Sequence, residues 1–210
     1  IVNCIGDLVS TKVDYERAIY LNAYLPHLLK KVASSLNCKL IHISTDCVFS
    51  GKKGSYLEGD YKDGKGLYAQ TKKMGEISSK NHLTIRSSII GPELKAQGRG
   101  LFQWFVTQNE PIDGYTKSVW SGVSTLELSK AIQWSIINDI SGLYHITNGI
   151  PINKNEILNL INNNLSSKKI ILPVVGKSQN KSFIDSRKLI NYKIPSYENM
   201  INTMVEDVKF

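Results

Sequence analysis

The sequence predicts an α/β fold with a doubly wound parallel sheet, on three observations. Apolar stretches with strand character occur at residues 1–6, 40–43 and 83–90. Between the first two, residues 14–36 carry apolar side chains at helical spacing. Between the last two, residues 67–76 are mostly good helix formers and include no proline. Strands that alternate with helices in this order are typical of parallel β-α-β units.

Composition and charge exclude several classes of protein. The chain has no apolar run of about 18 residues and no basic region at its start, so we expect neither a membrane span nor a signal peptide. Three cysteines at unrelated spacings favour a reducing, cytoplasmic location over a disulfide framework. The four histidines lack ligand spacing with the cysteines, and we expect no metal site. The net charge is +8, but the lysines are scattered and arginines are few, so no nucleic-acid partner is expected.

The N-terminal part should form a strand, a glycine turn and a helix. No Gly-x-x-Gly-x-x-Gly or Gly-x-Gly-x-x-Gly motif follows the strand 1–6, so the phosphate-binding first unit of a dinucleotide-binding fold is absent. Within the helix 14–36, Pro26 removes one backbone donor. We therefore expect a kink at Pro26 or the start of a second helix there.

Polar residues follow the second strand directly. Residues 44–46 read Ser-Thr-Asp, and chemistry commonly takes place at such strand ends. In the helix 67–76, Tyr68 and Lys72 lie one turn apart on one face. An ammonium at that distance should lower the pKa of the phenol toward neutrality, which would make Tyr68 a usable general acid. The Thr45 hydroxyl could hydrogen-bond the same substrate oxygen and hold a carbonyl in line for hydride attack.

A second Tyr-x-x-x-Lys match competes with this pair. Tyr61 and Lys65 have the same spacing, but Asp63 and Gly64 between them are typical of a turn. Their side chains need not share a helical face. We therefore favour Tyr68 over Tyr61.

The combination of these motifs resembles the extended short-chain dehydrogenase/reductases. Within that family, the dTDP-4-dehydrorhamnose reductase group reads Ser-Thr-Asp-Tyr-Val-Phe-x-Gly where residues 44–51 read Ser-Thr-Asp-Cys-Val-Phe-Ser-Gly. The resemblance implies a partial NAD(P)-binding Rossmann fold with a small C-terminal α/β substrate lobe. It also implies that Thr45, Tyr68 and Lys72 are the catalytic residues, with Tyr68 as proton donor. The implied reaction is reduction of the 4-keto group of a nucleotide-activated deoxysugar, with NADP or NAD as the cofactor.

The same resemblance implies further site residues. Those expected to bind the cofactor are Cys4, Ile5, Gly6, Tyr68, Lys72 and Ser88. Those expected to bind the nucleotide-sugar substrate are Thr45, Asp46, Cys47, Arg99 and Trp120. Cys47 replaces the family's Tyr. A nearby Lys72 ammonium would raise its thiolate fraction, although a buried, inert thiol is equally expected beside the apolar Val48 and Phe49. Asn22 matches a structural and proton-relay position of the family, although a surface position on its helix is equally expected.

The resemblance also suggests a division of the chain. Residues 1–90 would form the C-terminal half of the dinucleotide-binding domain and residues 91–210 the substrate lobe, with residues 119–148 returning to the Rossmann sheet. The first strand matches the family's fourth, so we infer a fragment that lacks strands one to three. The strand that distinguishes NAD from NADP is among them.

Later elements follow from local patterns. We expect a helix from about residue 98, a helix that ends at Ile137 and is capped by Ser124 or Thr125, and a last parallel strand at 142–147. Beyond these, the sequence predicts a helix at 153–165, a strand at 169–172 and a terminal helix from Ser196.

Two other functions stay open. An epimerase or dehydratase acting on a nucleotide sugar would have the same motifs, but dehydratases usually carry an Asp-Glu pair after the catalytic Thr, and here Asp46 is followed by Cys47. A catalytically silent regulatory protein, such as the regulatory subunit of methionine adenosyltransferase, also looks like this family. The residues leave the oligomeric state open, a homodimer included.

Overall fold

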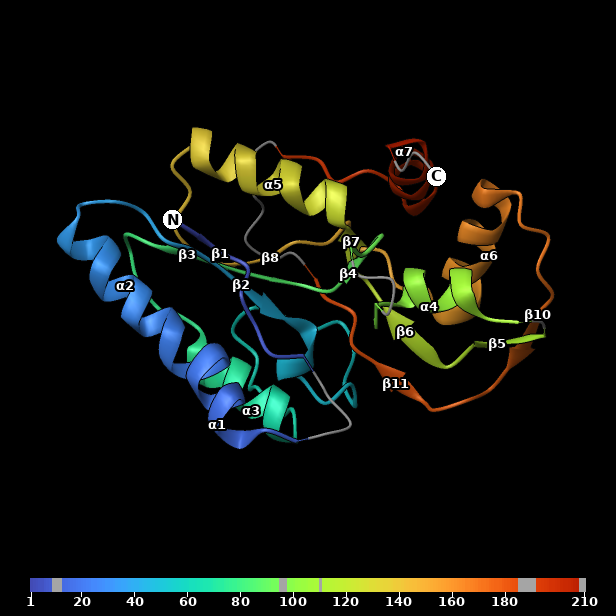
Figure 1. Ribbon diagram of the computed structural model, residues 1–210, viewed down its shortest axis with the longest axis horizontal. Coiled ribbons are helices and arrows are strands. Elements are labelled where there is room, and N and C mark those ends of the chain that lie inside the picture. Colours follow the sequence, from blue (N-terminus) through green and yellow to red (C-terminus); the bar gives the residue numbers. More distant parts are fainter. Residues whose placement is uncertain (9–12, 95–97, 110, 185–191, 208–210) are drawn as a thin grey trace.

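One parallel sheet organises the N-terminal half of the chain. The computed structural model describes residues 1–210 except 9–12, 95–97, 110, 185–191 and 208–210. The sheet has four strands in the order β1-β2-β3-β8, which are Val2–Asn3, Ile41–Thr45, Leu83–Ser87 and Gly142–His145. Figure 1 shows helices α1 (Tyr15–Ala18), α2 (Leu25–Ser35) and α3 (Leu67–Gly75) on one side of the sheet and α5 (Thr125–Ile137) on the other. The predicted doubly wound α/β fold is therefore confirmed.

The two faces of the central strands differ in chemistry. Side chains alternate along a strand, so Ile41, Leu83 and Ile85 point together into the core shared with α5. The alternate positions are polar, and they point to the side of α3. On that side the Thr84 hydroxyl exchanges hydrogen bonds with the backbone of Ile77, just after α3. The face toward α3 is therefore held by polar contacts, and the face toward α5 by apolar burial.

Pro26 has the effect that the sequence predicts. A π-helical segment, Ile19–Tyr24, joins α1 to α2, and Pro26 lies in the first turn of α2. Proline has no N–H to donate to the carbonyl of Asn22 four residues earlier, and that carbonyl faces the neighbouring helix α3. There it meets Gly75, where a Cβ atom would lie within 1.9 Å of the Asn22 oxygen. Glycine at the end of α3 is what allows the two helices to approach so closely.

The C-terminal half is a smaller α/β arrangement. Helices α4 (Leu101–Thr107), α6 (Lys154–Leu165) and α7 (Tyr197–Asp207) lie at the far end from β1 (Figure 1). Three small sheets accompany them: β5 (Ile112–Tyr115) with β10 (Ile171–Val174), β4 (Ile89–Ile90) with β7 (Val123–Ser124), and β6 (Ser118–Trp120) between β9 (Ile152–Asn153) and β11 (Gln179–Asn180). Of these strands, β5, β9 and β11 were not predicted.

Most of the later predictions are confirmed. Ser124 caps α5, because its hydroxyl accepts a hydrogen bond from the Glu127 amide at 3.1 Å. Strand β8 is at the edge of the parallel sheet, as expected for its last strand. The predicted strand at 169–172 is found two residues later, as β10.

One apolar core joins the two halves. It contains Leu83 and Ile85 of β3, Leu128 and Ala131 of α5, and residues of α4, α6 and α7. The central sheet and the smaller elements therefore bury a common core. Among the described residues, no helix is long and apolar enough to cross a membrane.

Candidate active site

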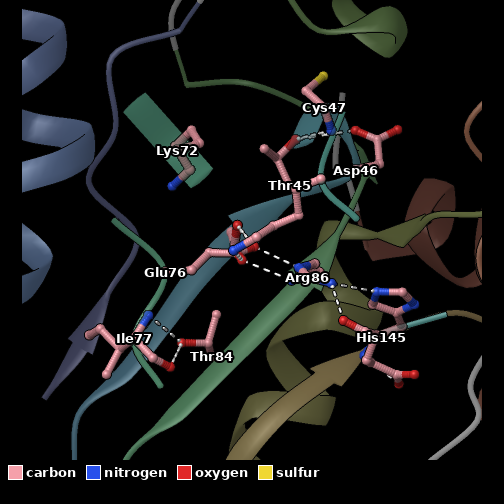
Figure 2. Close-up of polar contacts among 12 residues, drawn as sticks. Thr45, Asp46, Cys47, Lys72, Glu76, Ile77, Thr84, Arg86 and His145 are labelled. Carbon is pink, nitrogen blue, oxygen red and sulfur yellow. Dashed lines mark hydrogen bonds and ion pairs between the residues drawn. The ribbon is translucent and has the colours of Figure 1, made fainter. Parts of the chain in front are cut away.

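The carboxyl end of β2 forms a turn held by Thr45. The Thr45 Oγ accepts a hydrogen bond from the Cys47 amide at 3.1 Å and donates one to Asp46 Oδ1 at 3.2 Å (Figure 2). Thr45 thereby caps a short 3₁₀ turn, Asp46–Val48. Thr45 and Asp46 are both buried. The predicted polar strand end is thus a rigid, preorganised turn.

Tyr68 lies beside this turn. It is the second residue of α3, which begins after Gly66 in a left-handed conformation (φ 87°). Burial, together with the charges of Cys47 and Asp46, raises the pKa of Tyr68 above its ordinary value, and the nearby Thr45 hydroxyl offsets only part of this rise. The expectation that Lys72 lowers this pKa is therefore wrong. Burial of the phenol dominates, and Tyr68 stays protonated at neutral pH.

The Lys72 side chain contacts strand β2 and the loop after β1. Its ammonium is buried and donates to the Ile43 carbonyl at 2.7 Å. Burial lowers the pKa of Lys72 to about 8, and the charges of Glu76 and Cys4 oppose that shift. The ammonium lies one helical turn from Tyr68, but its contacts are with β2 and the loop after β1.

The loop after β1 lies against this ammonium. A Cβ atom on Gly6 would be 3.9 Å from Lys72 Nζ and 3.3 Å from Asn22 Oδ1. Asn22 is fully buried; it accepts from the Asp7 amide at 2.7 Å and donates to the Asp7 carbonyl and to the Thr71 hydroxyl. The surface interpretation of Asn22 is therefore wrong. Its side chain ties the loop after β1 to α3.

A cavity of about 670 Å³ opens beside Tyr68 and Cys47. Its wall comes from three parts of the chain, the loop after β1, the segment 47–69 and the C-terminal segment 177–181. Cys47 does not meet the Lys72 ammonium as expected. Lys181 Nζ is the cation beside it, 3.2 Å from the sulfur, and burial raises the pKa of the Cys47 thiol. Cys47 is therefore a neutral thiol in the cavity wall.

Several sequence-predicted residues are not brought to this cavity. Trp120 packs in the core against Tyr197, with only 6% of its surface exposed, and so offers no open face to a ligand there. Arg99 is exposed before α4, where its amide donates to Glu93. Ser88 is half-buried, and its carbonyl accepts from the Val123 amide. Tyr61 is 80% exposed outside α3, so the competing Tyr61–Lys65 pair does not share a helix.

A buried ion pair behind the site was missed by sequence reasoning. Arg86 of β3 binds both carboxylate oxygens of Glu76, at 2.6 and 2.8 Å, and also contacts His145 Nε2 and the Glu58 carbonyl (Figure 2). Burial lowers the pKa of His145 to about 4, so its neutral ring can accept from the guanidinium. Glu76 directly follows α3, and this network therefore fixes the end of the helix that carries Tyr68 and Lys72. A charged arginine inside a strand that the sequence predicts to be buried is the signal that could have found it.

No metal site accompanies these groups in the described part of the chain. There, no cluster of three or more His, Cys, Asp or Glu side chains is arranged to hold a metal ion.

The fold and the arrangement of these side chains identify the structural class of the protein. A doubly wound parallel sheet with Thr45, Tyr68 and Lys72 gathered at one strand end is a Rossmann-type α/β domain with a candidate site at the carboxyl edge of its sheet. Residues 10–208 match the family model of the RmlD substrate binding domain. The chain belongs to this family.

Similarity to individual proteins supports the assignment to this family. The chain is 24% identical over 146 residues to the spore coat polysaccharide biosynthesis protein SpsK of Bacillus subtilis, a match that covers 64% of this chain and 49% of SpsK. The chain thus spans about half the length of this curated relative. Among solved structures, it resembles dTDP-4-dehydrorhamnose reductase from Bacillus anthracis in complex with NADP (TM-score 0.82, 22% identity, covering 99% of this chain and 80% of that one). It also resembles ADP-L-glycero-D-manno-heptose-6-epimerase from Helicobacter pylori (TM-score 0.78, 15% identity, 98% and 70% covered). At these identities the structural likeness shows the fold alone.

Proposed function

We propose that the protein reduces the 4-keto group of a nucleotide-activated deoxysugar, with NADPH or NADH as hydride donor and Tyr68 as proton donor. The observation that carries this proposal is that α3 places Tyr68 beside the Thr45 turn at the end of β2, next to a cavity large enough for a small ligand. Membership of the RmlD substrate binding domain family supports the nucleotide-sugar substrate.

The proposed proton donor has the protonation state that reduction requires. Hydride addition to a ketone leaves an alkoxide, which is a stronger base than a phenolate. Because its pKa is raised, the Tyr68 phenol keeps its proton until that alkoxide forms and then gives it up. Thr45, held by the Cys47 amide, would orient the substrate carbonyl toward Tyr68.

The residues present fit the nicotinamide and ribose end of a dinucleotide cofactor. The Lys72 ammonium faces the loop Cys4–Gly6, and the absence of a side chain on Gly6 leaves room beside it. Lys72 and this loop would hold the nicotinamide and its ribose. When bound, the cofactor supplies the hydride. We further propose the division made above, in which residues 1–90 contribute to the cofactor side and residues 91–210 form the substrate lobe, with residues 119–148 returning to the Rossmann sheet through α5 and β8.

The test is turnover by the purified, intact protein. We expect it to consume NADPH or NADH when dTDP-4-dehydrorhamnose is added, at a rate that depends on both reactants. If no reduced cofactor is consumed with this or with other 4-keto nucleotide sugars, the proposal is wrong.

The titration of Lys72 predicts a pH dependence. A lysine whose pKa is lowered to about 8 is charged below that pH and neutral above it. We therefore expect kcat/KM, and cofactor affinity with it, to fall as the pH rises through about 8. Tyr68 does not titrate in this range, because its pKa is raised.

The control is Lys72→Arg, because arginine stays charged throughout this range. In this variant the loss of cofactor affinity above pH 8 should disappear, even if the overall rate is lower. An unchanged pH profile in Lys72→Arg would assign the titration to another group.

A further inference from the structure

The loop after β1 is held by polar side chains and not by apolar burial. Its residues Cys4, Ile5 and Gly6 are all exposed, so apolar contacts do little to fix their positions. The far end of the loop is tied to the helices by Asn22, whose Oδ1 accepts from the Asp7 amide at 2.7 Å. A separate anchor holds the near end.

Asn3 is the anchor at the near end. Its Oδ1 accepts a hydrogen bond from the Ile5 amide at 3.1 Å, which closes a turn over Cys4. Its Nδ2 lies 3.1 Å from His42 Nδ1, and the two residues are partners in the pairing of β1 with β2. Asn3 is only 2% exposed and His42 is fully buried. The turn at Ile5 is therefore connected to a buried ring of the central sheet.

The hydrogen bond between Asn3 and His42 has one possible direction. Because Oδ1 of Asn3 accepts from the Ile5 amide, Nδ2 is the group that faces the ring, and it can only donate. His42 Nδ1 is then the acceptor, and the ring proton lies on Nε2. Burial favours this neutral ring, because it lowers the pKa of His42 to about 3. Nε2 has no hydrogen-bond partner among the described residues, so the ring contributes its acceptor at Nδ1.

The next residue of β2 holds the group that faces this loop. The Ile43 carbonyl accepts from the Lys72 ammonium at 2.7 Å, and the Gly6 end of the loop lies against that ammonium. Two adjacent residues of β2 thus fix the two groups proposed to hold the nicotinamide and its ribose. Ile43 does so directly, and His42 does so through Asn3.

We propose that His42 is a positioning residue, which acts through Asn3 to hold the loop Cys4–Gly6 in the shape that receives the cofactor. This inference rests on the proposed function for the ligand of the loop. It gives the role to a residue that is buried in the sheet and does not line the cavity beside Tyr68.

The test compares three variants of the intact protein, His42→Leu, His42→Asn and His82→Leu. Leucine removes the acceptor, whereas the side-chain oxygen of asparagine can take the place of Nδ1. His82 is the matched control because it is also buried, and its ring contacts the Leu40 amide and the Ser34 hydroxyl at the amino end of β2, away from the loop.

Two measurements report on the loop. Hydrogen exchange of the Ile5 amide, followed by NMR, should be about fivefold to a hundredfold faster in His42→Leu, the effect of losing one buried hydrogen bond. NADPH affinity, measured by calorimetry, should fall by about threefold to thirtyfold, while kcat at saturating NADPH changes little. His42→Asn should stay close to the wild type in both measurements. His82→Leu should lower the free energy of unfolding and change neither.

The outcomes separate this inference from the proposed function. Unchanged exchange at Ile5 in His42→Leu would overturn it, as would an equal acceleration in His82→Leu, which would indicate general destabilisation. Faster exchange with unchanged NADPH affinity would also overturn it, because cofactor binding would then not depend on this anchor. If exchange at Ile5 responds as expected but the wild type binds neither NADPH nor NADH, the anchor stands and the cofactor of the proposed function is wrong.

Discussion

Replacing Tyr68 by phenylalanine should lower kcat by about 10² to 10⁴, the usual contribution of a positioned general acid. The substitution removes only the phenol hydroxyl near the Thr45 turn, and the ring stays at the start of α3. Cofactor affinity should change little, since Lys72 and the loop after β1 are untouched. Steady-state kinetics with dTDP-4-dehydrorhamnose and a titration with NADPH measure the two effects separately.

Tyr61→Phe is the matched control for this prediction. Tyr61 has the same spacing to a lysine but is exposed and lies outside α3. Its variant should retain wild-type activity. The reverse pattern, an active Tyr68→Phe and an inactive Tyr61→Phe, would mean that the wrong pair has been assigned.

Arg86→Met should destabilise the protein by about 3 to 5 kcal/mol, the cost of breaking a buried ion pair. The side chains of Arg86 and Glu76 are only 2% and 4% exposed, and Arg86 supplies two of the hydrogen bonds to this carboxylate. Lys62 and Ser44 also bind Glu76, so the loss should fall toward the lower end of that range. Urea unfolding of the variant and the wild type, followed by circular dichroism, gives the difference in free energy of unfolding.

Lys53→Met provides the comparison for Arg86→Met. It breaks the pair between Lys53 and Asp60, in which Lys53 is 56% exposed, and an exposed pair contributes little because water and salt screen it. We expect its effect to be a small fraction of that of Arg86→Met. Equal effects of the two substitutions would show that burial does not set the strength of the Arg86–Glu76 pair.

Local patterns were enough to predict the framework of the fold. The apolar run before Thr45, the helical spacing around Pro26 and the Ser124 cap each depend on neighbours in sequence, and each is found in the structure. Strands β5 and β11 were missed because each is short and pairs with a strand about 60 residues away, Ile171–Val174 and Ser118–Trp120 respectively. Pairing at that separation depends on tertiary packing, and no local pattern encodes it.

The sequence was enough to predict which residues form the site. It was not enough to predict their polar contacts or the direction of their pKa shifts. The spacing of Tyr68 and Lys72 places them one helical turn apart, but it does not show that the ammonium turns to the Ile43 carbonyl. The direction of the Tyr68 pKa shift depends on burial, which only the folded chain determines. The same holds for Lys181, which reaches Cys47 across 134 positions of sequence.

The measurement that tests the central claim most directly follows the hydride. The intact protein is given dTDP-4-dehydrorhamnose and NADPH carrying deuterium at the transferred position of the nicotinamide, and the product is analysed by mass spectrometry and NMR. The proposed reduction predicts one deuterium on C4 of the sugar and one NADPH consumed per product formed. A product that is an isomer or a dehydrated form of its substrate, without deuterium and with no net loss of NADPH, would contradict the reduction and identify an epimerase or dehydratase instead.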